Sequence, residues 1–157
     1  MKINGFLIVP IFLVCTIAWS GEEKVIEMKD VPKSIMEKAK EVMPDAQFVS
    51  ANTETEDDGT MVYEIQGKLS DGRKIEVDIF PDNSVEEIEV EFTHDLVPGA
   101  VLNAIEKKLP GFKPTYIEAS HSESNKVVQY EFEGEFGEMK MDLDVSADGR
   151  TIVVSDK

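Results

Sequence analysis

The sequence predicts an α+β fold of two tandem repeats, each with one helix packed on a four-stranded antiparallel sheet. Three observations indicate this. An alternating Tyr-Glu segment occurs at residues 63–67 and again at residues 130–134, and its period of two is typical of a half-buried strand. A Val-Pro pair precedes a helical pattern in each half, at Pro32 and at Pro98. The similarity extends over most of the chain, as expected for an internal repeat.

Residues 1–20 have the layout of a secretory signal peptide. Lys2 supplies a positive start, residues 6–17 form an almost unbroken apolar run, and Ala18-Trp19-Ser20 offers a cleavage site. The apolar run is shorter than the ~20 residues that span a bilayer. We therefore expect export to the periplasm or beyond, with no membrane span after cleavage. A retained anchor and lipid attachment at Cys15 are the alternatives.

The charge and cysteine content restrict the function classes. The chain has a net charge of −16, which becomes −17 without Lys2, the one charged residue of the leader. Such an acidic chain would repel a phosphate backbone, so we expect no nucleic-acid partner. Because Cys15 is the only cysteine, packing and not disulfides must hold the exported chain together.

The first repeat is expected over residues 31–92, after a charged lead-in at residues 21–30. Asp30 can cap a helix, Pro32 suits its first turn, and apolar residues then recur at helical spacing until Pro44. Strands are expected at residues 47–56 and 61–69. Two more follow, with Ile75, Val77 and Ile79 and then Ile88, Val90 and Phe92 turned inward.

The second repeat is expected over residues 97–154. Its helix carries apolar residues four positions apart, at Val97, Val101, Ile105 and Leu109. Its strands are expected at residues 116–122, 127–136, 138–145 and 151–154. Only residues 93–96 separate the two repeats, so we expect them to pack together.

Short motifs shared by the two halves resemble the exported PepSY-like family, which is related in fold to the β-lactamase inhibitor protein. The first half carries Val31, Pro32, Pro44, Ala51, Tyr63, Glu64, Gly67, Asp71, Gly72 and Asp82, and the second carries Val97, Pro98, Pro110, Gly111, Ala119, Tyr130, Glu131, Gly134, Asp148 and Gly149. The second half departs from the pattern where Gly137 alone replaces Asp71-Gly72. The resemblance implies a helix on an antiparallel sheet, export, and a protein-binding or inhibitory role. It supplies no catalytic residue.

Catalytic, metal and cofactor sites are not predicted. His94 and His121 are the only histidines, and neither has a second histidine or a cysteine at metal-ligand spacing. Neighbouring strand residues point to opposite faces, so Tyr63 is expected in the core and Glu64 outside it, and likewise Tyr130 and Glu131. We expect no enzyme. The sequence leaves the oligomeric state open.

The outer face of the predicted sheets is the candidate partner-binding surface. It carries Glu64, Glu76, Asp78, Glu87, Glu89 and Glu91 in the first half, and Glu131, Glu133, Glu135, Asp142 and Asp144 in the second. Facing like charges destabilise a sheet, so this surface favours docking of an unidentified protein with a basic patch. Two alternatives are a solvated face that keeps the protein soluble and a calcium-binding or buffering protein, with aspartates in turns as oxygen ligands.

Overall fold

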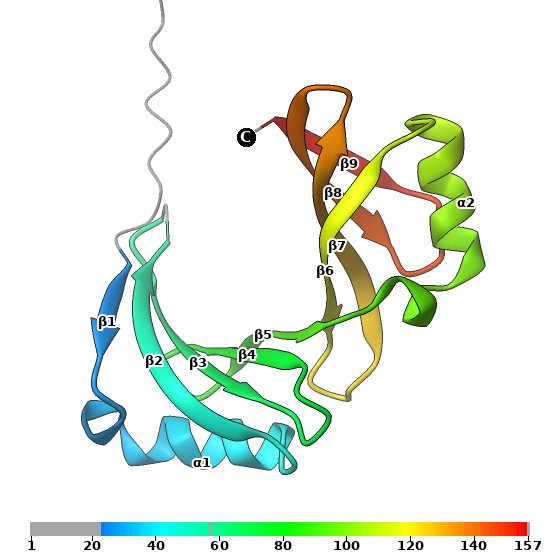
Figure 1. The fold of residues 1–157 in the computed structure, drawn as a ribbon. Coiled ribbons are helices and arrows are strands. Elements are labelled where there is room, and N and C mark those ends of the chain that lie inside the picture. Colours follow the sequence, from blue (N-terminus) through cyan, green and yellow to red (C-terminus); the bar gives the residue numbers. More distant parts are fainter. Residues whose placement is uncertain (1–22, 57, 157) are drawn as a thin grey trace, which may run out of the picture.

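The structure is a computed structural model and describes residues 23–56 and 58–156 (Figure 1). The predicted signal peptide lies outside the described residues. The described residues form two α-helices, α1 (Lys33–Val42) and α2 (Gly99–Lys108), each preceded by a short 3-10 helix, η1 (Met28–Asp30) and η2 (His94–Leu96). The strands are β1 (Lys24–Ile26), β2 (Gln47–Thr55), β3 (Met61–Lys68), β4 (Lys74–Ile79), β5 (Val85–Glu91), β6 (Lys113–His121), β7 (Val127–Phe136), β8 (Met139–Ser146) and β9 (Ile152–Asp156).

All nine described strands form one antiparallel sheet in the order β1 to β9. The predicted fold of two four-stranded units is therefore wrong. β5 and β6 are hydrogen-bonded neighbours, with Val90 opposite Ala119 and Glu91 opposite Glu118. Each of these strands would otherwise expose a row of unpaired backbone groups, and pairing them removes two open edges. β1 adds a ninth strand, which pairs with β2.

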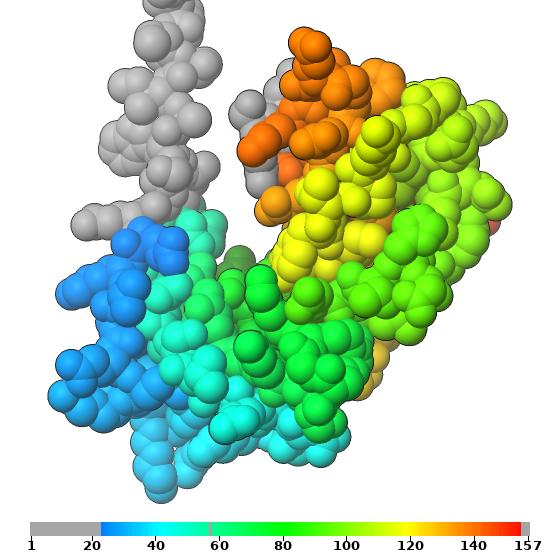
Figure 2. Space-filling view, in the orientation of Figure 1, coloured from blue at the N-terminus to red at the C-terminus, as the bar shows by residue number. Residues whose placement is uncertain are grey.

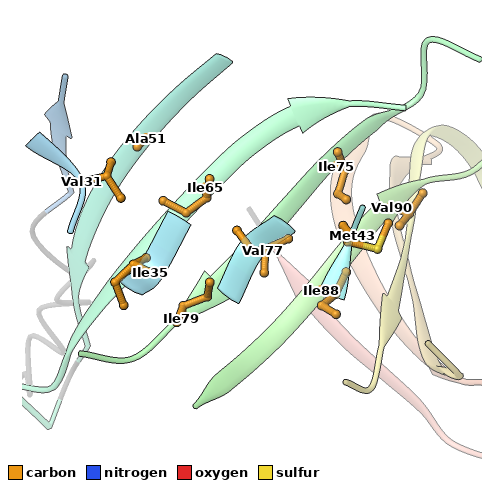
Figure 3. Packing of buried hydrophobic residues seen from close by; sticks show 11 residues of the cluster. Val31, Ile35, Met43, Ala51, Ile65, Ile75, Val77, Ile79, Ile88 and Val90 are labelled. Carbon is orange, nitrogen blue, oxygen red and sulfur yellow. The ribbon is translucent and has the colours of Figure 1, made fainter. Parts of the chain in front are cut away.

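Both α-helices lie on the convex side of a strongly curved sheet (Figure 1). The face that the sequence predicted as the outer face is the opposite, concave side. α1 covers β2 to β5 through a core that includes Ile35, Ile65 and Val77, and Figure 3 shows these side chains converging. α2 covers β6 to β9 through a second core that includes Val101 and Phe132. Neither helix of the described residues lies on the opposite, concave side of the sheet.

The helix starts differ from the expectation in one detail. Asp30 lies in η1, and Pro32 itself occupies the position before α1, where no side chain caps the helix. Pro98 has the same place before α2. In α1 the Pro32 carbonyl accepts the first helical hydrogen bond, from the Met36 N–H at 3.1 Å.

Gly67 and Gly134 lie where the strands bend. The register shifts by one residue between Phe48 and Ser50, opposite Gly67, and again between Pro114 and Tyr116, opposite Gly134. A Cβ on Gly67 would lie 2.5 Å from the Gln47 carbonyl oxygen, and a Cβ on Gly134 would overlap the Phe112 ring. Such bulges bend and twist a sheet. The two glycines therefore permit the curvature that makes one face concave.

Contacts outside the sheet also join the two arms, β1 to β5 and β6 to β9. Phe92 packs against both cores, and its ring lies 5.7 Å from the Tyr130 ring in an edge-on arrangement. Lys38 on α1 reaches the turn between β6 and β7, where its Nζ lies 2.5 Å from Glu123 Oε1. The two arms are therefore joined by side-chain contacts as well as by the β5–β6 pairing.

Candidate functional site

The concave side of the sheet carries a band of acidic side chains, which we call the acidic face. Strand alternation places on it all eleven carboxylates that the sequence suggested, together with Glu54 and Glu118, which were not singled out. In the space-filling view the two arms stand apart and leave a hollow between them (Figure 2). The acidic face therefore lines a concave surface of the molecule.

Carboxylates on the acidic face lie directly opposite one another across neighbouring strands. The register gives seven such pairs: Glu64–Asp78, Asp78–Glu87, Glu76–Glu89, Glu91–Glu118, Glu118–Glu131, Glu131–Asp144 and Glu133–Asp142. Each pair of neighbouring strands from β3–β4 to β7–β8 contributes at least one such carboxylate pair, which the continuous sheet makes possible. Like charges in this position repel, so the arrangement destabilises the isolated sheet.

The centre of the band is at the β5–β6–β7 junction. Carboxylate oxygens of Glu87, Glu89 and Glu131 all lie within 4.8 Å of one another. Ser120 on β6 is buried between them and donates its hydroxyl to Glu131 Oε1 at 2.7 Å. This is the one group of three or more candidate metal-ligand side chains among the described residues. It joins residues from both halves of the chain.

Burial and like charges raise the pKa of several of these carboxyl groups. Burial first, and then the charges of Glu76 and Glu89, raise the pKa of Asp78 to about 9. Burial, followed by the charge of Glu118, also raises the pKa of Glu89 to about 9. Desolvation and like charge both disfavour an ionised carboxylate. The buried carboxyl groups of this surface therefore favour the protonated form more than exposed acids do.

Glu64 is the most buried acid of the band. The sequence placed it on a solvated outer face, but only 9% of its surface is exposed. Burial and a hydrogen bond with Glu54 raise its pKa to about 7, while a hydrogen bond from Asn52 opposes the increase. Curvature explains the difference, because side chains on the inner side of a bent sheet crowd one another.

Neutral polar side chains hold some of the carboxylates in place. Gln66 Nε2 donates to Glu76 Oε2 at 2.7 Å, and the Tyr116 hydroxyl donates to Glu118 Oε1 at 2.6 Å. Lys74 lies beside this group, with its Nζ 5.0 Å from the Tyr116 ring centroid. These residues line part of a depression of about 400 Å³ between β2–β4 and β6. The alternation of residues 116–122 could have identified Tyr116 and Glu118.

The end of the band on β7 and β8 is more open. Glu133 and Glu135 are exposed, and Glu135 lies opposite Lys140 on β8 and Lys113 on β6. The excess of negative charge is therefore concentrated toward the middle of the sheet.

The other sequence-predicted positions have structural roles. Tyr130 is buried in the second core, whereas Tyr63 is only partly buried against the first. His121 is buried and its Nδ1 lies 2.7 Å from the Ala119 carbonyl oxygen. His94 begins η2, in the connection between the arms.

The carboxylates of the turn aspartates accept hydrogen bonds from the backbone of their own turns. The carboxylates of Asp58, Asp71, Asp82 and Asp148 each accept a hydrogen bond from the backbone N–H two residues later, at 2.8–3.1 Å. Side-chain hydrogen bonds from Thr60, Arg73 and Ser84, followed by these backbone bonds, lower the pKa of Asp58, Asp71 and Asp82, and the backbone bond from Arg150 lowers the pKa of Asp148. Each aspartate is thus the ordinary side chain of a tight turn, which weakens the calcium alternative at these positions.

Comparison with known proteins identifies the fold. The structure is similar to the crystal structure of a BLIP-like protein (BF1215) from Bacteroides fragilis NCTC 9343, with a TM-score of 0.61 and 21% sequence identity, covering 80% of this chain and 85% of that one. The fold relation expected from the sequence is thereby confirmed. A protein of unknown function from Bacteroides vulgatus ATCC 8482, proposed to be periplasmic, aligns over 86% of this chain and all of that one, with 19% identity and a TM-score of only 0.39.

Sequence comparisons add no family. No protein-family model matches the chain, and no curated protein matches it. Membership of the PepSY-like family therefore stays a prediction. Within the part of the chain that the structure describes, no helix is long and apolar enough to cross a membrane.

Proposed function

We propose that this chain is an exported, non-enzymatic protein that binds a basic region of a partner protein through the acidic face. As an inhibitor or regulator, it would act on an enzyme of the envelope or the extracellular space. The observation that carries the proposal is the row of seven facing carboxylate pairs on the concave side of the sheet.

Electrostatics argue for a cationic partner. Repulsion between facing carboxylates destabilises the free protein, and lysine or arginine side chains placed among them would replace repulsion by attraction. Complementary charge also speeds association and suppresses wrong partners. A concave surface can surround a protruding segment of the partner, so that several pairs are neutralised together.

Two further observations support export and a protein-binding role. The leader pattern at residues 1–20 favours export, and the BLIP-like neighbour is compatible with a protein-binding role. The sequence motifs support assigning residues 31–92 and 97–154 to two PepSY-like sequence units that share the one sheet. We do not extend any activity of a neighbour to this chain, because fold likeness alone does not transfer function.

A capture experiment from the native envelope tests the proposal. The full chain is crosslinked in place, and recovered partners are identified at low and at high salt. We expect a partner with a basic surface whose recovery falls as salt screens exposed charges over ~8–10 Å. The variant Glu118→Gln/Glu131→Gln should lose the partner, whereas Glu37→Gln/Glu41→Gln on α1 should keep it. Recovery that is equal for both variants would contradict the proposal.

Calcium binding is the second candidate function, because Glu87, Glu89 and Glu131 bring three carboxylates within 4.8 Å. Calcium takes six to eight oxygen ligands at about 2.3–2.6 Å. A ligand that binds only the folded state raises the melting temperature by mass action. Calcium-dependent stabilisation that Glu89→Gln abolishes would favour this candidate over protein binding.

A further inference from the structure

Proton sharing between carboxylates follows from the geometry of the acidic face. Glu89 is the central residue, since it lies opposite Glu76 on β4 and next to Glu87 and Glu131 at the β5–β7 junction. Two carboxylates that face each other in a half-buried setting raise each other's pKa, which disfavours the state in which both are ionised. One proton held between them removes the repulsion.

The charged groups around Glu89 are almost all acidic. Its own strand contributes Glu87 and Glu91, and the neighbouring strand β4 contributes Glu76 and Asp78. On the other side β6 contributes Glu118, β7 contributes Glu131 and Glu133, and β8 contributes Asp144 behind Glu131. Lys74, which lies over the Tyr116 ring, is a cation on the same face.

We propose that the acidic face holds shared protons when it is free and releases them when a cationic partner docks. Docking then strengthens as the pH rises. This inference rests on the proposed function for its release step, whereas the storage of protons is a property of the chain alone. The exchange is balanced: where an ammonium or guanidinium group pairs with a protonated carboxyl group, the O–H bond breaks, one proton leaves to solvent and the carboxylate keeps the electron pair.

Infrared spectroscopy of the protein alone tests proton storage. At about pH 7, where ordinary carboxyl groups are fully ionised, we expect a carbonyl band from protonated carboxylic acid. The band should shrink in Glu89→Gln and stay unchanged in Glu37→Gln, which alters an exposed carboxylate on α1. The presence or absence of the band in the wild-type protein tests proton storage even if Glu89→Gln fails to fold. Absence of the band above about pH 6 would overturn the inference.

Calorimetry with an oligolysine peptide tests proton release. Binding heats measured in two buffers of different ionisation enthalpy give the number of protons released. We expect at least one proton per bound peptide, and an affinity that rises ~tenfold per pH unit for each proton released. Binding without proton release overturns this inference and leaves the proposed function intact. No oligolysine binding at any pH overturns the release step and the proposed function together, while the infrared band still reports storage.

Discussion

Asp78 on β4 lies directly opposite Glu87 on β5, and Asp78 Oδ1 is buried without a hydrogen-bond partner among the described residues. An ionised carboxylate in that position lacks both solvent and a counter-charge. Burial raises the pKa of Asp78 to about 9, so the group is neutral near pH 7. On the concave side of the sheet, folding therefore disfavours the ionised form of buried carboxyl groups such as Asp78.

Stability should fall as the pH rises. The folded pKa values of Asp78 and Glu89, about 9, lie far above the ordinary values of 3.8 and 4.5. Between these limits the folded state binds more protons than the unfolded state, so its stability is present at acidic pH and is lost toward pH 9. We expect the free energy of unfolding to drop on the order of 2 kcal/mol between about pH 5 and pH 9.

Urea titrations at several pH values check this slope. The turn aspartates, whose pKa values are lowered, should reduce stability only when the pH falls below about 4. A free energy of unfolding that rises between about pH 5 and pH 9 would contradict the raised pKa values.

Neutralising Asp78 should stabilise the protein at alkaline pH. Asp78→Asn keeps the size of the side chain and does not ionise in the unfolded state, so folding no longer has to protonate this group. At about pH 8 we expect a gain of about 1–2 kcal/mol, a figure reduced for the partial exposure of the group. The matched control Glu37→Gln should leave the stability unchanged, because that carboxylate is exposed on α1. Equal urea midpoints for Asp78→Asn and wild type at this pH would count against the assignment.

Gly67→Ala and Gly134→Ala should each destabilise the fold by roughly 1–3 kcal/mol. In both cases the added methyl group meets backbone of the neighbouring strand, which cannot move without flattening the bend. Gly99→Ala is the control, since nothing lies within 4 Å of its Cβ position at the start of α2. Thermal melts compare the three variants. A loss for Gly99→Ala as large as for Gly67→Ala would refute the steric explanation.

The sequence predicted which face of the sheet each strand residue occupies, but it did not predict that the fifth and sixth strands pair. Alternation in segments such as residues 74–79 and 127–136 places acids and apolar residues on opposite sides whatever the neighbouring strand is. Nothing in residues 85–91 or 113–121 states that these two edges pair, because backbone hydrogen bonds carry no side-chain signature. The repeat even suggested the opposite, two complete units.

The identity of most acids in the candidate site was predictable from the sequence, but their burial and their raised pKa values were not. The eleven acids were found by counting alternate positions, and Glu118 was overlooked because its strand carries fewer charges. The burial of Glu64 depends on sheet curvature, which arises at bulges opposite Gly67 and Gly134. A bulge can be located only when the register between two strands is known, and the register is known only from the three-dimensional pairing of the strands. Raised pKa values therefore could not be foreseen from the sequence.

The ion pair between Lys38 and Glu123 should hold the two arms at a fixed opening. Lys38 belongs to α1, which packs on β2 to β5, whereas Glu123 lies in the turn between β6 and β7. The Lys38 side chain is only 17% exposed, and hydrogen bonding to Glu123 raises its pKa. We expect Lys38→Met to speed amide hydrogen exchange at residues 122–126, where backbone bonds close the turn.

Lys33→Met provides the matched control for this exchange experiment. Lys33 is 90% exposed and pairs with Glu37 within the same helix, so its loss removes a lysine from α1 without touching the second arm. Exchange in the β6–β7 turn should therefore stay at the wild-type rate. Acceleration that is equal in both variants would mean that the turn responds to the charge of α1 and not to the contact with Glu123. Acceleration confined to Lys38→Met would establish that this contact restrains the arms, and with them the width of the acidic face.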